Sequence, residues 1–176
     1  MLEISNTIIL MIDMQEKLVS ATSAEFEVKQ AEKILKASEI LDIPVLVSEQ
    51  YPKGLGQTVP SLRSEKQHYI EKTAFSIFNE SGFDEIIKGY NRKQIVLFGI
   101  ETHICVYQTA MDLVKNGYEV ILVKDACKSR KEFEYETGIE LMRQNGVKIS
   151  SVEIVLFELL KTSKHTNFKE IQQLIK

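Results

Sequence analysis

Short apolar runs alternate along this chain with stretches in which apolar residues recur every three or four positions. The run from Thr7 to Ile12 is continuous, as expected of a strand that is covered on both faces. The stretch from Phe26 to Leu41 has helical spacing instead. Strands that alternate with helices in this way are typical of a parallel α/β sheet.

The same reasoning predicts the other elements. We expect strands at 45–47, 68–71, 94–98, 119–123 and 147–152, and helices at 82–90, 102–117, 133–144 and 168–175. The segment 50–60 is rich in proline and glycine and is predicted to be a long irregular loop. Right-handed crossovers and a switch point between the first and fourth strands suit the strand order 3-2-1-4-5-6. Because no repeat or linker interrupts the pattern, residues 1–176 are expected to form one domain.

The amino-acid composition and net charge limit the kinds of molecule that this chain can be expected to bind. The chain has 176 residues, a net charge of −3 and 44% hydrophobic residues, which excludes a disordered tail. A mildly acidic balance argues against a nucleic-acid groove or an anionic membrane surface, and the longest apolar run is too short to span a membrane. We therefore expect small-molecule substrates and other copies of this chain as partners. The two cysteines form no CxxC pair and the N-terminus lacks the charge of a signal peptide, so a reducing cytoplasm is expected.

Polar residues follow several predicted strands at the edge of the sheet where ligands bind. Asp13 follows the first strand, Lys72 the third, and Cys105 the fourth. Each alone has an ordinary interpretation: a turn carboxylate, a solvated surface ammonium and an inert core thiol. Together they place an acid, a cation and a thiol in one crevice. Cys105 is also expected in the first turn of a helix, where the dipole favours a thiolate, with Asp13 as its proton acceptor.

Three segments resemble the isochorismatase-like cysteine hydrolases: 9–15 (ILMIDMQ), 71–76 (EKTAFS) and 99–106 (GIETHICV). The segment 50–56 (QYPKGLG) is similar to the small isochorismatase-domain-containing branch of that family. The resemblance implies helices on both faces of a six-stranded parallel sheet, a Rossmann-like three-layer α/β/α fold. It also implies Asp13 as general base, Lys72 as electrostatic partner and Cys105 as nucleophile.

The resemblance further implies a cis peptide bond between Ile100 and Glu101 and an oxyanion hole formed by the N–H groups of Ile104 and Cys105. The implied reaction is acyl transfer from a small amide or related C–N bond through a thioester. Hydrolysis of a vinyl ether, as in the isochorismatase reaction, or of an ester is the alternative within the same class. A non-catalytic oligomeric scaffold with the same fold is the alternative from a different class.

No cofactor is expected, and a metal site is not expected because the segment 48–51 lacks the Asp-x-His cluster of nicotinamidase-like relatives. Five residues are candidates for substrate binding: Gln15, Gln50, Tyr51, Phe75 and His103. Aromatic residues at such positions are more often core or subunit contacts, and His103 fits a helix-start residue bonded to the backbone equally well. A homo-oligomer is implied by the resemblance, and the apolar segments 155–160 and 171–175 offer surface for it to cover. Burial of these segments within one chain is an equally physical alternative.

Overall fold

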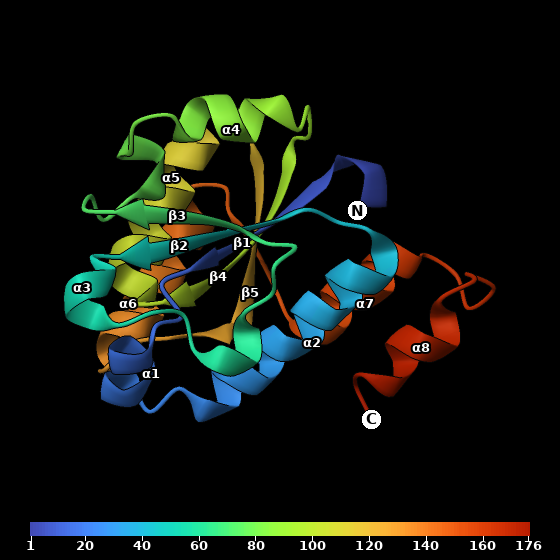
Figure 1. Cartoon of the computed structure of the whole chain (residues 1–176). Coiled ribbons are helices and arrows are strands. Elements are labelled where there is room, and N and C mark those ends of the chain that lie inside the picture. The colour runs from blue at the N-terminus through green and yellow to red at the C-terminus, as the bar shows by residue number, and fades with distance from the viewer.

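Six parallel strands form the centre of the molecule in a computed structural model that describes residues 1–176. Their order is β3-β2-β1-β4-β5-β6, which confirms the order predicted from the sequence (Figure 1). The strands are β1 (Thr7–Ile12), β2 (Val45–Gln50), β3 (His68–Lys72), β4 (Gln94–Ile100), β5 (Glu119–Lys128) and β6 (Lys148–Ser150).

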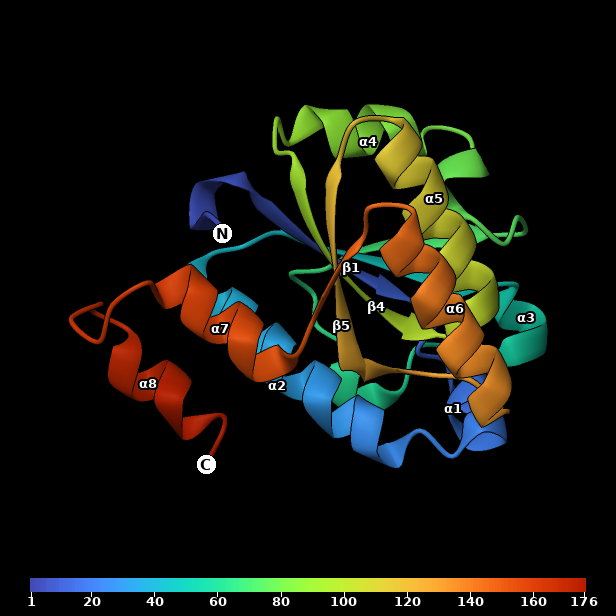
Figure 2. The same ribbon diagram turned by 180° about the vertical axis from the view of Figure 1, so that it is seen from behind.

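Helices cover both faces of this sheet and complete a three-layer α/β/α fold. The helices are α1 (Glu16–Thr22), α2 (Glu25–Leu41), α3 (Pro52–Leu55), α4 (Phe83–Gly89), α5 (Tyr107–Lys115), α6 (Glu132–Gln144), α7 (Val152–Leu160) and α8 (Phe168–Gln173). Figures 1 and 2 show α2 and α7 on one face and α4, α5 and α6 on the other. No helix has both the length and the apolar character needed to cross a membrane.

The central strand β1 explains why the site lies where it does. All six of its side chains are buried, because β2 and β4 flank it and helices cover both its faces. Such a strand needs apolar residues at every position rather than at alternate ones, and its sequence TIILMI nearly supplies them. The first charged side chain after it, Asp13, therefore lies at the carboxyl edge of the sheet and is still fully buried.

The region after β5 differs from the sequence-based prediction. The strand expected at 147–152 is only three residues long, and Val152 begins α7 instead. The Ser151 side chain caps this helix by accepting a hydrogen bond from the backbone N–H of Ile154. Two other short helices also lie outside the prediction: α1, and α3 within the segment expected to be an irregular loop.

Helix α7 also changes the argument for an oligomer. Five of its apolar side chains are buried against the core of this same chain: Val152, Val155, Leu156, Leu159 and Leu160. Ile171 of α8 is buried as well. Most of this apolar surface is therefore buried within one chain, which is the alternative that the sequence left open beside an oligomer contact.

Gly99 is where β4 approaches β1 too closely for any side chain. Its φ is +139°, and an added Cβ would lie 2.0 Å from the backbone oxygen of Ile12. We expect Gly99→Ala to lower the free energy of unfolding by at least about 3 kcal/mol, measured by urea denaturation, because backbone atoms cannot move aside cheaply. Gly117→Ala is the matched control. It has a φ of +79° and open space around the added Cβ, so it should cost only about 1 kcal/mol. Equal losses would contradict the close-approach argument.

Candidate active site

Three strand ends bring Asp13, Lys72 and Cys105 together. Asp13 lies in the turn after β1 with a φ of +49°, Lys72 is the last residue of β3, and Cys105 follows β4. The Asp13 Oδ2 atom lies 2.7 Å from the Lys72 Nζ atom, and both side chains are 0% exposed. The Cys105 thiol lies close enough to both groups for their charges to shift its pKa, and the residue is 7% exposed. The structure therefore places the predicted base, cation and nucleophile in one buried cluster.

The Lys72 ammonium is held entirely by oxygen atoms of this chain. Besides Asp13, it donates to the Gln50 Oε1 atom at 2.5 Å, to the Phe75 carbonyl at 3.0 Å and to the Ala74 carbonyl at 3.2 Å. These three hydrogen bonds account for all three N–H bonds of an ammonium group, and the contact with Asp13 is an ion pair. Lys72 is thus a fixed internal charge rather than a mobile cation that reaches for a ligand.

Ser48 is part of the cluster, although the sequence analysis did not single it out. Its hydroxyl donates to the Asp13 Oδ1 atom at 2.6 Å, so that each carboxylate oxygen of Asp13 has its own partner. The signal that would have found it is the strand register. Ser48 pairs with Ile12, directly before Asp13, and neighbouring positions at the end of adjacent parallel strands meet at one edge of the sheet.

The ionisation of Cys105 differs from what the sequence predicts. Burial raises the pKa of its thiol to about 12, the negative charge of Asp13 adds to the rise, and Lys72 opposes it. The expectation of a thiolate is wrong for this structure, because the desolvation of a buried anion outweighs the helix-start position of Cys105. The resting cluster therefore contains an ion pair and a neutral thiol.

Cys105 lies in a π-helical turn, Thr102–Val106, that joins β4 to α5. The peptide bond between Ile100 and Glu101 is cis. The Ile104 N–H donates to the Glu101 carbonyl at 3.1 Å, so this member of the predicted oxyanion hole already has a partner. The buried hydroxyl of Thr102 has no hydrogen-bond partner and does not cap this turn.

Two contacts hold this turn from outside. The Glu101 carboxylate accepts hydrogen bonds from the Arg130 backbone N–H and side-chain Nε atom, both at 3.0 Å. Helix α6 packs closely against the turn at Gly138, where an added Cβ would lie 3.0 Å from the His103 Cα atom. The position of Cys105 therefore depends on Arg130 and α6 as well as on the turn that carries it.

The five predicted substrate-binding residues do not line one common cleft. Gln15 is fully buried and its amide is engaged by the backbone. It donates to the Gln50 and Gly56 carbonyls at 3.0 and 2.7 Å, and accepts from the Gln50 N–H at 2.7 Å. Gln15 therefore braces the two loops beside Asp13, and the expectation of a substrate contact gains no support from its geometry. Gln50 contacts Lys72, as described above.

The other three candidates lie on different sides of the cluster. Tyr51 lines a cleft of about 330 Å³ beside Lys72, whose walls are Tyr51, Pro52, Lys53, Glu71, Lys72, Thr73 and Glu80. Phe75 projects from the neighbouring turn and is 54% exposed. His103 lines a separate cleft with Arg130, and its Nδ1 atom lies 3.0 Å from the Ser129 hydroxyl.

The fold and this cluster define an α/β protein with a buried acid, ammonium and thiol at the switch point of a parallel sheet. The isochorismatase domain profile matches residues 7–154, and the chain belongs to this family. Membership in a family of isochorismatase-like hydrolases supports hydrolase activity in general.

Individual relatives agree with this assignment. A zebrafish (Danio rerio) protein named isochorismatase domain-containing protein 2 is 40% identical over 176 residues, which are 99% of this chain and 89% of that protein. A solved structure of a Caenorhabditis elegans protein named MAR1 ribonuclease is 35% identical, with a TM-score of 0.92 over 99% of this chain and 91% of that one. The Escherichia coli YcaC gene product, described as an octameric hydrolase of unknown specificity, shares the fold. It has a TM-score of 0.88 at 19% identity, over 99% of this chain and 94% of that one.

Proposed function

We propose that this protein hydrolyses a small-molecule amide or a related C–N bond through a thioester on Cys105. The observation that carries the proposal is the buried cluster in which one carboxylate forms an ion pair with an ammonium and lies near a thiol. A carboxylate beside a neutral thiol can accept the thiol proton, and a fixed ammonium offsets the negative charge that then forms on sulfur.

The reaction follows from this arrangement in two halves. In the first, Asp13 takes the thiol proton as the sulfur attacks the carbonyl carbon, and the C–N bond breaks as Asp13 returns the proton to the leaving amine. In the second, Asp13 takes a proton from water, whose oxygen attacks the thioester, and the free acid leaves as the thiol reforms. We propose the N–H groups of Ile104 and Cys105 as the oxyanion hole, with the Ile104 N–H exchanging the Glu101 carbonyl for the substrate oxygen.

The charges of the site do not favour cleavage of RNA, although one relative is named a ribonuclease. A phosphodiester brings negative charge and calls for cations that are free to contact it. The cation of the cluster, Lys72, has all its N–H bonds directed to oxygens of this chain and is fully buried. With its neutral thiol, the cluster suits an uncharged group such as an amide.

The proposal is tested by a screen of small amides, ureas and carbamates, with ammonia or amine release as the readout. We expect at least one compound class to be turned over and its acyl mass to appear on the Cys105 peptide after an early quench. Turnover of vinyl ethers or esters alone would replace the C–N assignment. The absence of turnover and of any acyl adduct would favour the scaffold alternative.

We expect the same activity to be unchanged by EDTA. No group of three or more His, Cys, Asp or Glu side chains lies close enough together to hold a metal ion, and zinc or iron sites need such a donor set. The measurement is the initial rate before and after chelation. Loss of activity that zinc or iron restores would contradict this prediction.

We further propose that residues 1–176 act as one hydrolase domain in a homo-oligomer in the reducing cytoplasm. One sheet with one continuous core supports the single domain. The octameric E. coli neighbour is consistent with an oligomer, and a thiol nucleophile suits a reducing compartment. A sedimentation mass near the 20.2 kDa of one chain would argue against the oligomer.

A further inference from the structure

We propose that Glu80 is a positioning residue that fixes the Lys72 ammonium through the backbone turn at 73–75. Glu80 contacts neither Cys105 nor Asp13 through any hydrogen bond or ion pair. It acts on the far side of the turn that supplies two of the oxygens around Lys72. The consequence for turnover rests on the proposed cysteine mechanism, whereas the consequence for thiol reactivity does not.

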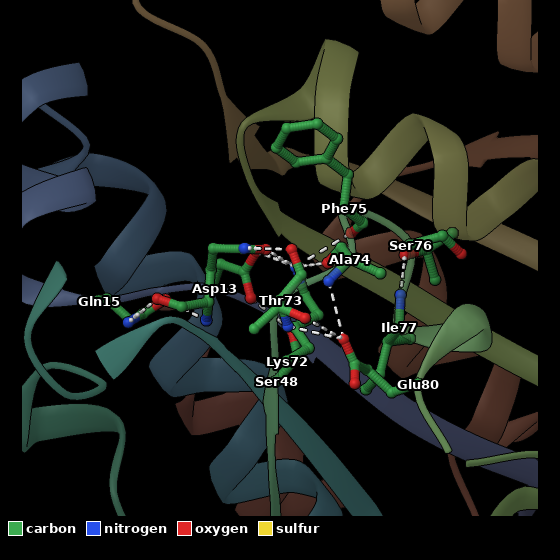
Figure 3. Close-up of polar contacts among 12 residues, drawn as sticks. Asp13, Gln15, Ser48, Lys72, Thr73, Ala74, Phe75, Ser76, Ile77 and Glu80 are labelled. Atoms are coloured by element: carbon green, nitrogen blue, oxygen red, sulfur yellow. Dashed lines mark hydrogen bonds and ion pairs between the residues drawn. The ribbon is translucent and has the colours of Figure 1, made fainter. Parts of the chain in front are cut away.

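The first step of the argument is the contact between Glu80 and the turn. One carboxylate oxygen, Oε1, accepts the backbone N–H of Thr73 at 2.6 Å and that of Ala74 at 2.7 Å, together with the Thr73 hydroxyl at 3.3 Å (Figure 3). Hydrogen bonds to a charged acceptor are short and about twice as strong as neutral ones. These backbone bonds, from Ala74 and Thr73, also lower the pKa of Glu80, so that it stays ionised and keeps accepting them.

The second step concerns the carbonyl groups on the opposite side of the same turn. The carbonyls of Ala74 and Phe75 accept hydrogen bonds from the Lys72 ammonium at 3.2 and 3.0 Å. The N–H groups of this turn are bound on one side and its carbonyl groups on the other. These bonds restrict the orientation of the peptide groups in the turn. Glu80 and Lys72 therefore hold the two faces of one segment of backbone.

The third step is the lack of other support for this turn. Residues 73–76 belong to no helix or strand, and the Thr73 and Phe75 side chains are exposed. The Gln50 amide donates to the Thr73 carbonyl at 2.8 Å, and the Ile77 N–H donates to Thr109 of α5 at 3.3 Å. Ser76 is buried and accepts the N–H groups of Phe78 and Asn79. None of these contacts holds the N–H groups of residues 73 and 74. Without Glu80, those groups turn to water and the two carbonyls lose their fixed direction.

The test compares Glu80→Ala with Glu80→Gln and with Glu85→Ala. Glutamine can still accept the two N–H bonds through its amide oxygen, whereas alanine cannot. Glu85 is an exposed acid on α4, so its removal matches the change in net charge. We expect Glu80→Ala to lower kcat by about 5–30-fold with little change in KM, Glu80→Gln to recover most of that loss, and Glu85→Ala to match the wild type.

A double-mutant cycle with Lys72→Met shows whether Glu80 acts through Lys72. The readout is the rate of iodoacetamide alkylation of the Cys105 peptide at pH 9, which needs no substrate, with thermal unfolding measured alongside. We expect Glu80→Ala to change this rate severalfold when Lys72 is present and by less than about twofold in the Lys72→Met background. Equal effects in the two backgrounds, or an unchanged rate with Lys72 present, would overturn the proposal. Ordinary turnover by Cys105→Ala would instead overturn the proposed function and leave the alkylation result standing.

Discussion

Replacing Cys105 with alanine is expected to lower kcat by at least about 10³-fold, to the background of the assay, because a covalent route has no substitute for its nucleophile. The fold should survive, since the change removes one sulfur atom from a side chain in the π-helical turn before α5. Cys105→Ser should be nearly as inactive, because Asp13 is a weak base for an alcohol. The measurements are steady-state kinetics on a verified substrate, together with circular dichroism and thermal unfolding of each variant.

Cys127 provides the matched control. It is a second buried free cysteine whose pKa burial also raises to about 12, but it lies in β5 and contacts the Gly99 backbone rather than Asp13 or Lys72. Cys127→Ala should retain normal kcat at a stability cost of about 1 kcal/mol. Acyl mass found on the Cys127 peptide, or ordinary turnover by Cys105→Ala, would contradict covalent catalysis at Cys105 and favour direct attack by water.

The positions of Asp13, Lys72 and Cys105 after predicted strands were enough to predict that these three residues lie close together. The buried run before Asp13 and the strands before Lys72 and Cys105 predicted one sheet edge, and the strand order is confirmed. Their chemical roles stay predictions. The residues that orient them, Ser48 and Glu80, were not predicted. The contact of Ser48 with Asp13 depends on the register of β2, and the contact of Glu80 with Ala74 depends on the course of the turn at 73–75.

Burial explains the main errors. The sequence predicts that Cys105 lies in the first turn of a helix, but not that the surrounding layers remove it from water. This desolvation is the largest cause of its raised pKa. The same applies to α7. Its apolar residues indicate a need for burial, whereas whether they pack on their own chain or on a second copy depends on the path after Ser151. The hydrophobic pattern identifies which residues must be buried, and the tertiary structure determines which residues bury them.

The largest pH-dependent effect is expected from changing the two charges beside Cys105. Burial and the Asp13 carboxylate raise the thiol pKa to about 12, while Lys72 lowers it. Asp13→Asn therefore lowers this pKa and Lys72→Met raises it further. At a pH well below the pKa, the fraction of thiolate rises about tenfold when the pKa falls by one and drops by the same factor when it rises by one. At pH 9, alkylation of Cys105 should thus be faster than wild type in Asp13→Asn and slower in Lys72→Met.

Turnover should follow a different pattern, and the contrast identifies the role of Asp13. If the carboxylate acted by charge alone, its removal would favour the thiolate and speed the reaction. As the proton acceptor and donor of both half-reactions, it cannot be replaced by an amide, so Asp13→Asn should lower kcat/KM by on the order of 10²-fold or more. Lys72→Met should lower both alkylation and turnover. Because breaking a buried ion pair costs about 3–5 kcal/mol, the rates are compared per folded molecule, well below each variant's unfolding temperature. Faster alkylation combined with slower turnover in Asp13→Asn is the result that a general base requires, and faster turnover would rule that role out.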